Sequence, residues 1–267
     1  MKNKIKTLIK NSFLEYWLYL MKSIVVRPKS QSNETEIIRG LLTKFGPRIK
    51  KTFVEFGFSS WEYNCAALPK DWSGLLIDGD YQNVKIGKVI STNRIEIVHA
   101  WLTLNNIKEM ISEWLGSREL GILSIDIDGN DYWFVERLIT IRPSVFIVEY
   151  NSTLGFRDIT IPYDENFDRT KAHPSWTYFG ASLLAMQRLL TNAGYDLVDI
   201  SDSGVNAFFV RSDLNQGLCD VLDPKVSFKP KAFFDGSTPD EQWKQIEHMP
   251  YVRFNDHLQN NRTIGFF

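Results

Sequence analysis

The sequence predicts an α/β fold built on a mostly parallel sheet. From residue 51 onward, short apolar segments rich in β-branched residues alternate with segments of helical periodicity. Such alternation is typical of a parallel sheet with helices on both faces. Two of the apolar segments, 120–125 and 144–148, are nearly continuous, as expected of strands that are buried on both faces.

Seven strands are predicted in chain order, at residues 52–55, 74–77, 94–98, 120–125, 144–148, 195–200 and 206–211. Helices are predicted at residues 61–68, 80–89, 104–114, 131–140 and 178–193. Gly194 follows the last of these helices and is a common helix terminator. The final two strands are joined by Ser-Asp-Ser-Gly at 201–204, which is typical of a hairpin turn. We therefore expect the last strand of the sheet to be antiparallel.

Three regions are expected along the chain. Residues 1–48 are predicted to be an N-terminal helical extension, 49–213 the α/β domain, and 214–267 a C-terminal tail that packs on the domain and contains a short helix at 240–247. Within the domain, the segment 152–176 is rich in Pro, Asp, Gly and aromatic residues and has no sustained period. A loop of this length is commonly a lid, a binding loop or an insertion.

Composition excludes several classes of protein. The chain of 267 residues has 31 Lys and Arg against 32 Asp and Glu, so its net charge of −1 gives no bulk attraction to nucleic acid. The two cysteines, Cys65 and Cys219, have neither zinc-site nor disulfide-framework spacing, which suits a reducing compartment. No apolar run is long enough to span a bilayer, and the N-terminus lacks a cleavage site. We expect a cytoplasmic protein that does not bind nucleic acid.

The N-terminal segment has a basic and amphipathic pattern. Lys2, Lys4, Lys6 and Lys10 precede or interrupt a set of apolar residues that falls within about half of a helical circumference. This set consists of Ile5, Leu8, Ile9, Phe13, Trp17 and Leu20. A helix of this kind packs on the domain, contacts a partner subunit or a second copy of the chain, or lies on a membrane surface. The sequence leaves these alternatives open.

Acidic residues follow the first two predicted strands. Glu55 ends the first strand and is followed by Gly57, and Ser59 can cap a helix. Asp78 and Asp80 end the second strand, where an acid can accept the ribose hydroxyls of a nucleotide-like cofactor. A single glycine beside an acid is a poor site for a diphosphate, because like charges repel. The pattern favours a cationic cofactor such as S-adenosylmethionine over a dinucleotide.

A second acidic group follows the fourth and fifth predicted strands. Asp126 and Asp128 are two residues apart, and Glu149 and Asn151 end the neighbouring strand. Converging oxygen donors of this kind suit Mg²⁺ or Mn²⁺, which would orient an acceptor hydroxyl and lower its pKa. In the alternative interpretation, Asp126 caps a turn, residues 128–130 form an Asx turn, and Glu149 binds substrate hydroxyls.

With these motifs, the chain resembles the class I S-adenosylmethionine-dependent methyltransferases, in particular the FkbM-like branch associated with sugar and polyketide O-methylation. The resemblance covers about residues 50–211. It rests on the segments 53–57 (Phe-Val-Glu-Phe-Gly), 72–80, 123–132 (Leu-Ser-Ile-Asp-Ile-Asp-Gly-Asn-Asp-Tyr), 148–151, 178–183 and 206–211. The chain departs from the class at Ser59 and Trp61, which stand where its loop has further glycines.

The resemblance implies a Rossmann-like class I methyltransferase fold, a three-layer sandwich around a seven-stranded sheet with an antiparallel last strand. It implies that S-adenosylmethionine is the cofactor, with Glu55 and Gly57 by its methionine part, Asp78 on its ribose, and the segment around Ala100 and Trp101 beside its adenine. The cofactor side as a whole consists of Glu55, Gly57, Phe58, Ser59, Asp78, Asp80, Ala100, Trp101 and Asp126.

The expected reaction is O-methylation of a saccharide or a glycosylated small molecule, for example in polysaccharide biosynthesis. Asp128, Asp126 and His99 are the catalytic candidates, with His173 as a further candidate base. The metal candidates are Asp128, Glu149 and Asn151. The loop residues Tyr163, Phe167, Trp176 and Tyr178 are expected either to stack on a sugar or to pack the loop on the domain.

Two other functions are consistent with the same residues. The Asp-x-Asp-Gly core at Asp126 and Asp128 also occurs in phosphatases of the haloacid dehalogenase type, which favours a metal-dependent hydrolase. A catalytically silent binding module is the other alternative, because loop glycines are missing.

Overall fold

The computed structural model describes residues 13–231 and 236–254. Its main sheet has the order β3-β2-β1-β4-β5-β8-β7, and only β8 runs antiparallel to its neighbours. The strands are β1 (Thr52–Phe56), β2 (Ser73–Asp78), β3 (Ile95–His99), β4 (Ile122–Ile125), β5 (Val145–Glu149), β7 (Tyr195–Ile200) and β8 (Asn206–Arg211). All seven predicted strands and the antiparallel last strand are confirmed.

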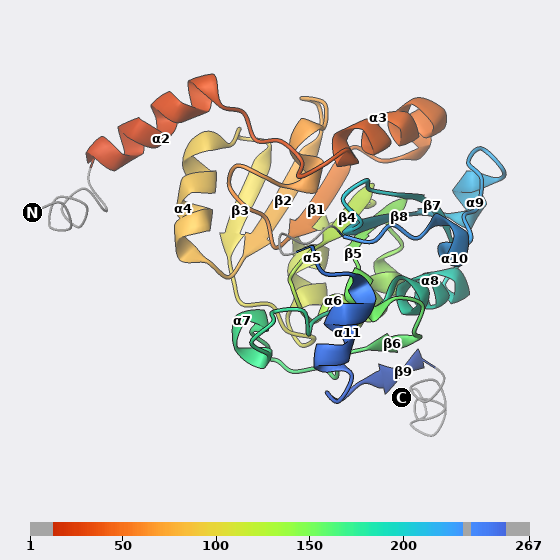
Figure 1. Ribbon diagram of the computed structural model, residues 1–267. Coiled ribbons are helices and arrows are strands. Elements are labelled where there is room, and N and C mark those ends of the chain that lie inside the picture. The colour runs from red at the N-terminus through yellow and green to blue at the C-terminus, as the bar shows by residue number, and fades with distance from the viewer. Residues whose placement is uncertain (1–12, 232–235, 255–267) are drawn as a thin grey trace, which may run out of the picture.

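Helices cover both faces of this sheet, which makes three layers (Figure 1). On one face lie α3 (Glu34–Phe45), the 3₁₀ helix η2 (Asn64–Ala67) and α4 (Tyr81–Ile90). On the other face lie α5 (Ile107–Leu115), α6 (Asp131–Leu138) and α8 (Leu183–Asn192). The order reverses between β1 and β4, so the carboxyl ends of these two strands form a topological switch point.

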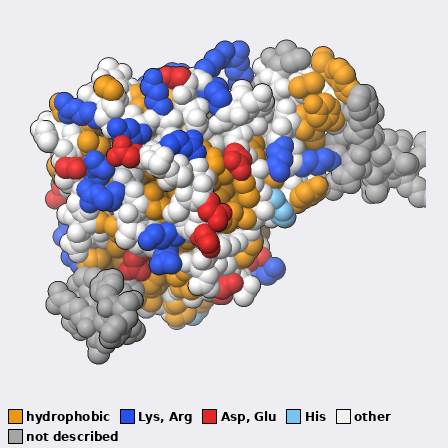
Figure 2. All heavy atoms as spheres, turned by 180° about the vertical axis from the view of Figure 1, so that it is seen from behind, with side chains coloured by type: hydrophobic (Ala, Val, Ile, Leu, Met, Phe, Trp, Pro, Cys, Tyr) orange, Lys and Arg blue, Asp and Glu red, His pale blue; other side chains and the backbone are white. Residues whose placement is uncertain are grey.

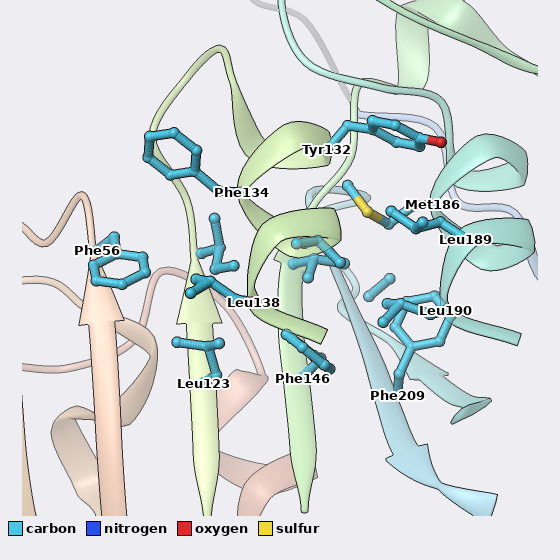
Figure 3. Close-up of a cluster of buried hydrophobic side chains, with 14 of the residues drawn as sticks. Phe56, Leu123, Tyr132, Phe134, Leu138, Phe146, Met186, Leu189, Leu190 and Phe209 are labelled. Carbon is cyan, nitrogen blue, oxygen red and sulfur yellow. The ribbon is translucent and has the colours of Figure 1, made fainter. Parts of the chain in front are cut away.

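The strands are apolar on both faces because each face meets helices. In β5, Val145 and Ile147 pack toward α3, whereas Phe146 and Val148 pack toward α6 and α8. Figure 3 shows the second cluster, in which Leu123 and Phe146 from the sheet meet Leu138, Met186 and Leu190 from the helices. This burial explains why these strands have no polar alternation.

Two predicted helices are corrected by tertiary contacts. The predicted helix 61–68 is absent: a bridge joins Ser59 to Glu62, and only η2 follows, because the Glu55 carboxylate binds the backbone N–H groups of Asn64 and Cys65. The predicted helix 178–193 begins at Leu183, where the Ser182 hydroxyl accepts a hydrogen bond from Ala185 N (3.0 Å).

The segment 152–176 and the C-terminal region pack on each other. The segment contains η4 (Ser152–Leu154), β6 (Ile159–Thr160) and α7 (Arg169–Ala172). The strand β9 (Val252–Arg253) pairs with β6, and Ile246 of α11 (Pro239–Ile246) lies in one small core with Leu154 and Ile161. Between β8 and α11 the chain forms α9 (Ser212–Asn215) and α10 (Pro224–Ser227). The C-terminal region thus supports the loop that follows β5.

The helix α2 (Phe13–Val25) projects from the body and contacts α4 (Figure 1). It includes the predicted amphipathic residues Phe13, Trp17 and Leu20, whereas Ile5, Leu8 and Ile9 lie outside the described residues. Among the helices that are described, none has the length and apolar character needed to cross a membrane.

Candidate active site

A cavity of about 290 Å³ opens at the carboxyl edge of the sheet, beside the switch point. Its wall comes from the residues that follow β1, β2, β3 and β4 and from the loop after β5. Five carboxylates line the cavity, and no Lys, Arg or His of the described chain lines it. These carboxylates belong to Asp78, Asp80, Asp126, Asp128 and Glu165. The wall therefore favours a cationic ligand over an anionic one.

Gly57 allows the chain after β1 to pass close to the chain after β4. Its φ of 72° lies in the left-handed region, and a Cβ atom there would be 1.5 Å from the Asp126 backbone oxygen. Only glycine can adopt this conformation so close to a neighbouring strand. The chain after β1 is thus held against the chain after β4, and both border the same cavity.

Asp78 and Asp80 both line the cavity but have different surroundings. Asp80 is the N-cap of α4, with Oδ1 accepting a hydrogen bond from Gln82 N (2.7 Å). Asp78 Oδ1 accepts one from Asp80 N (2.6 Å). Burial raises the pKa of Asp78, while the Asp80 N–H group opposes that shift. Asp80 therefore has a structural role as well as a place in the wall.

Trp101 presents an exposed aromatic ring to the cavity. The side chain is 57% exposed, and its Nε1 donates to the Glu165 carbonyl (2.9 Å). A Cβ on Gly79 would lie 2.9 Å from the ring, so the glycine gives the ring its position. A large aromatic residue that is exposed yet fixed from two sides suits stacking on a planar ligand. Ala100 lines the same wall, as predicted.

Asp126 is the cavity carboxylate with the most perturbed titration. Burial raises its pKa, and the charges of Asp128 and Asp131 raise it further, while a hydrogen bond with Glu149 lowers it. Glu149 lies in the interior and has a pKa well above its ordinary value, chiefly because of burial and next because of Asp126. Its Oε2 is buried with no hydrogen-bond partner in the described chain. The two carboxyl groups thus favour a state that holds a proton between them.

The neighbouring acids are held by specific partners. The Asp131 carboxylate accepts hydrogen bonds from Ile127 N and Gly129 N, both at 2.9 Å, which holds the turn after β4. Asp128, at a φ of 55°, forms an ion pair with Arg169 of α7. The guanidinium of Arg169 lies 3.6 Å from the centre of the Phe179 ring and lowers the pKa of Glu149. Arg169 is therefore the cation that offsets this acidic group.

The loop after β5 lies beside the turn that follows β4 and forms part of the cavity wall. Glu165 and Phe167 line the cavity, and the Phe167 ring packs against Gly129. Asn130 holds the loop by donating from Nδ2 to the Asp164 carbonyl (2.8 Å) and accepting from Asp164 N (3.3 Å). Tyr163 accepts a hydrogen bond from Leu104 N (3.2 Å). We call residues 161–172 the lid.

Four residues predicted on the cofactor or catalytic side lie away from the cavity. Glu55 is 2% exposed, and its oxygens accept hydrogen bonds from Asn64 N (2.6 Å) and Cys65 N (2.9 Å), so it organises η2. Phe58 packs in the core below α4, and Ser59 lies in the bridge to Glu62. His99 points to the Gly79 carbonyl, 3.0 Å from Nε2, with its ring edge-on to Tyr81.

The predicted metal ligands are not arranged as a metal site. The Asn151 amide is fully used, with Nδ2 donating to the carbonyls of Thr177 (2.7 Å) and Phe179 (2.9 Å) and Oδ1 accepting from Thr153 N (3.0 Å). Asp128 is paired with Arg169, and Glu149 lies behind Asp126. Within residues 13–231 and 236–254, no group of three His, Cys, Asp or Glu residues is placed to hold a metal.

Other loop residues lie outside the cavity. Trp176 and Tyr178 do not line the cavity, and the buried Tyr178 donates its hydroxyl hydrogen to the Pro250 carbonyl (2.6 Å). His173 contacts Ser175 and His248. Arg169 is a site residue that the sequence did not predict, because no spacing in the sequence links it with Asp128, 41 residues earlier.

Comparison with known proteins gives remote matches in structure alone. No protein-family model matches the sequence, and no curated protein matches it. The chain is similar to the O-methyltransferase from Bacillus cereus in complex with SAH, at 13% identity over 78% of this chain and 94% of that chain, with a TM-score of 0.42.

Two further structures match to a similar extent. The N-terminal domain of EvdMO1 with SAH bound gives 13% identity over 68% of this chain and 80% of that chain, with a TM-score of 0.43. The plantazolicin methyltransferase BamL gives 10% identity over 89% and 80%, with a TM-score of 0.42. The strand order and the antiparallel β8 define the Rossmann-like three-layer fold predicted from the sequence.

Proposed function

We propose that this chain is an S-adenosylmethionine-dependent O-methyltransferase that acts on a saccharide or a glycosylated small molecule. The observation that carries the proposal is the wall of the switch-point cavity, which combines five carboxylates with the exposed ring of Trp101 and contains no cation among the described residues. A sulfonium and an ammonium group are attracted by such a wall, whereas a diphosphate is repelled.

The residues of the wall fit the parts of this cofactor. Asp78, at the end of β2, would hold the ribose hydroxyls, and Ala100 and Trp101 would flank the adenine ring. Gly57 and Asp126 border the part of the cavity that would take the methionine portion. When bound, S-adenosylmethionine supplies an electrophilic methyl group.

Asp126 is the best-supported proton acceptor. Once ionised, the Asp126 carboxylate would accept the proton of an acceptor hydroxyl, and its raised pKa makes it a stronger base than an ordinary carboxylate. The bound cofactor would supply the methyl group and leave as S-adenosylhomocysteine. The Glu149 carboxyl group, which forms a hydrogen bond with Asp126, shares the negative charge with it. Asp128 is paired with Arg169, and His99 lies outside the cavity, so neither is as well placed.

The lid supports the acceptor class. Phe167 offers a ring that can stack on the apolar face of a sugar, and Glu165 offers a carboxylate that can accept sugar hydroxyls. Asn130 and Asp128 lie opposite in the same wall. No step is assigned to a metal, because two of the three side chains expected to hold one, Asn151 and Asp128, are engaged elsewhere. A phosphatase-like hydrolase with an aspartate nucleophile is less well supported, because its anionic phosphate ester would be repelled by a wall of five carboxylates.

Calorimetric titration with S-adenosylmethionine and S-adenosylhomocysteine tests the proposal. We expect both to bind, and we expect Asp78→Asn to weaken binding by about tenfold or more, the value of a hydrogen bond to a charged group. Asp220→Asn, an exposed acid far along the chain, is the matched control and should leave affinity unchanged. Absence of binding at millimolar ligand would remove the proposal.

The same titration in two buffers tests the place of Asp126. A cation bound beside a carboxyl of raised pKa lowers that pKa, so we expect S-adenosylmethionine to release up to about one proton at pH 7. The neutral sulfur of S-adenosylhomocysteine should release less. Asp126→Asn should abolish the difference between buffers. An unchanged proton release in this variant would show that Asp126 does not face the cofactor.

A further inference from the structure

A second cavity, of about 520 Å³, lies between the end of α2, α3, η2 and the end of α4. We call it the basic cavity, because its rim carries Arg27, Arg39, Lys70 and Arg94. It adjoins the start of β3, whereas the candidate active site lies at the carboxyl ends of the strands. The two cavities share no lining residue.

None of the four cations of the basic cavity forms an ion pair within the described part of the chain, and only Arg94 interacts with a nearby acid, Asp71. Arg94 also donates to the Trp72 carbonyl (2.9 Å). No Asp or Glu of the described residues lines this cavity. Apolar side chains, including Phe58, Leu76 and Ile97, form its floor. Four cations above an apolar floor suit an anionic group that is attached to an apolar body.

The helix α2, whose Ser23 lines the basic cavity, carries an apolar stripe on its other face. Trp17, Leu18, Met21 and Val25 share one helical face and are 46%, 55%, 56% and 84% exposed. The opposite face carries the less exposed Tyr19, Leu20 and Ser23, and α2 contacts α4. Figure 2 shows hydrophobic side chains gathered on this projecting arm, with basic side chains close by. Large apolar side chains exposed together mark an interaction surface.

We propose that this end of the molecule binds an anionic phospholipid surface. Lipid phosphates would occupy the basic cavity, and the stripe of α2 would enter the boundary between headgroups and acyl chains. An amphipathic helix with basic residues beside it has the features of an interfacial helix. Lys2, Lys4, Lys6 and Lys10 precede α2 in the sequence and add charge of the same sign.

Charge selects this occupant over the alternatives. A second copy of the chain docked here would bring like charges together, which costs free energy. A free phosphate would use the cavity alone and leave the stripe of α2 exposed. Only a surface that is both anionic and apolar uses both features. This inference is independent of the proposed function, because it uses neither the cofactor nor the candidate active site.

Vesicle co-sedimentation with the full chain tests the proposal. We expect binding to vesicles that contain phosphatidylglycerol, little binding to phosphatidylcholine alone, and weaker binding at high salt. Arg27→Gln, Arg39→Gln and Lys70→Gln combined should weaken binding by about 100-fold, since each basic residue near an anionic surface contributes about fivefold. Lys108→Gln, Lys225→Gln and Lys244→Gln combined make the same change of charge elsewhere and should have little effect.

A second variant tests the helix separately. Met21→Ser combined with Val25→Ser leaves the basic cavity intact and should weaken vesicle binding by at least about tenfold, because apolar area no longer enters the membrane. Equal binding by this variant and the wild type, or by both triple variants, would overturn the proposal. So would binding of inorganic phosphate without vesicle binding, or a dimer that is lost in the Met21 and Val25 variant.

Discussion

At Gly57 the backbone has a φ of 72° and passes against the carbonyl of Asp126. A methyl group at this position would lie 1.5 Å from that oxygen, so one of the two chain segments must move. We predict that Gly57→Ala lowers the free energy of unfolding by about 3 kcal/mol or more, measured by urea denaturation. It should also weaken ligand binding, because both segments border the cavity.

Gly116 provides a matched control for this substitution. It also has a positive φ, of 57°, but nothing lies within 4 Å of the position that a Cβ atom would take there. Gly116→Ala should therefore cost only the backbone conformational term, about 1 kcal/mol. If the two variants lose equal stability, the close approach at Asp126 is not what requires glycine at position 57.

For Asp126 and Asp128, the sequence pattern predicts the position but not the chemical surroundings. Their spacing places both at one strand end, and both line the cavity. Their chemistry differs because tertiary neighbours differ: Asp126 meets Glu149, and Asp128 meets Arg169. Glu55 and His99 also lie at or beside strand ends. The Glu55 carboxylate, however, accepts hydrogen bonds from η2, and the His99 ring contacts the Gly79 carbonyl. Sequence position identified the edge of the sheet but not the direction of each side chain.

At the scale of elements, strands were easier to predict than helices. The buried strands β4 and β5 carry their signature within a few residues, because both faces must be apolar. The conformation of residues 61–68 is not determined by their own sequence pattern, because the Glu55 carboxylate of β1 binds their backbone N–H groups. The lid is likewise determined by distant partners, such as Asn130 for Asp164.

The lid is held to the acidic group by the ion pair of Arg169 and Asp128. The Arg169 side chain is 21% exposed, and its Nε also donates to the Trp176 carbonyl (2.6 Å). We predict that Arg169→Gln increases hydrogen exchange of the α7 amides of Lys171 and Ala172 by about tenfold, because a partly buried charged hydrogen bond is lost. Exchange measured by mass spectrometry over residues 161–176 would detect this.

Lys171 gives the control on the same helix. Its ion pair with Asp168 is exposed, with Lys171 82% exposed, so Lys171→Gln should leave exchange of the lid nearly unchanged. Exchange in α4, on the other face of the sheet, should be unaffected in both variants. If Arg169→Gln exchanges at the wild-type rate, the ion pair does not hold the lid.

At the scale of the whole molecule, several acids are buried at one edge of the sheet. Burial raises the pKa of Glu55 to about 7, and it also raises the pKa values of Asp126, Asp131 and Glu149. Perturbed carboxyl groups of this kind are common at functional sites, where they reduce stability for the sake of chemistry. The chain therefore has an unfavourable electrostatic contribution that depends on pH.

We predict that the free energy of unfolding falls as pH rises from 4.5 to 8. In this window the folded state holds protons on acids that the unfolded state has lost, so stability decreases with pH, by roughly 3 kcal/mol for Glu55 alone between pH 4.5 and 7. Urea denaturation across the window measures the slope. Glu149→Gln should flatten this slope, because the variant removes one buried acid and, with it, the repulsion between the charges of Glu149 and Asp126. Asp168→Asn should not, since the pKa of that acid is already lowered to about 2. A stability that is constant or rises with pH would contradict the titration of these buried acids.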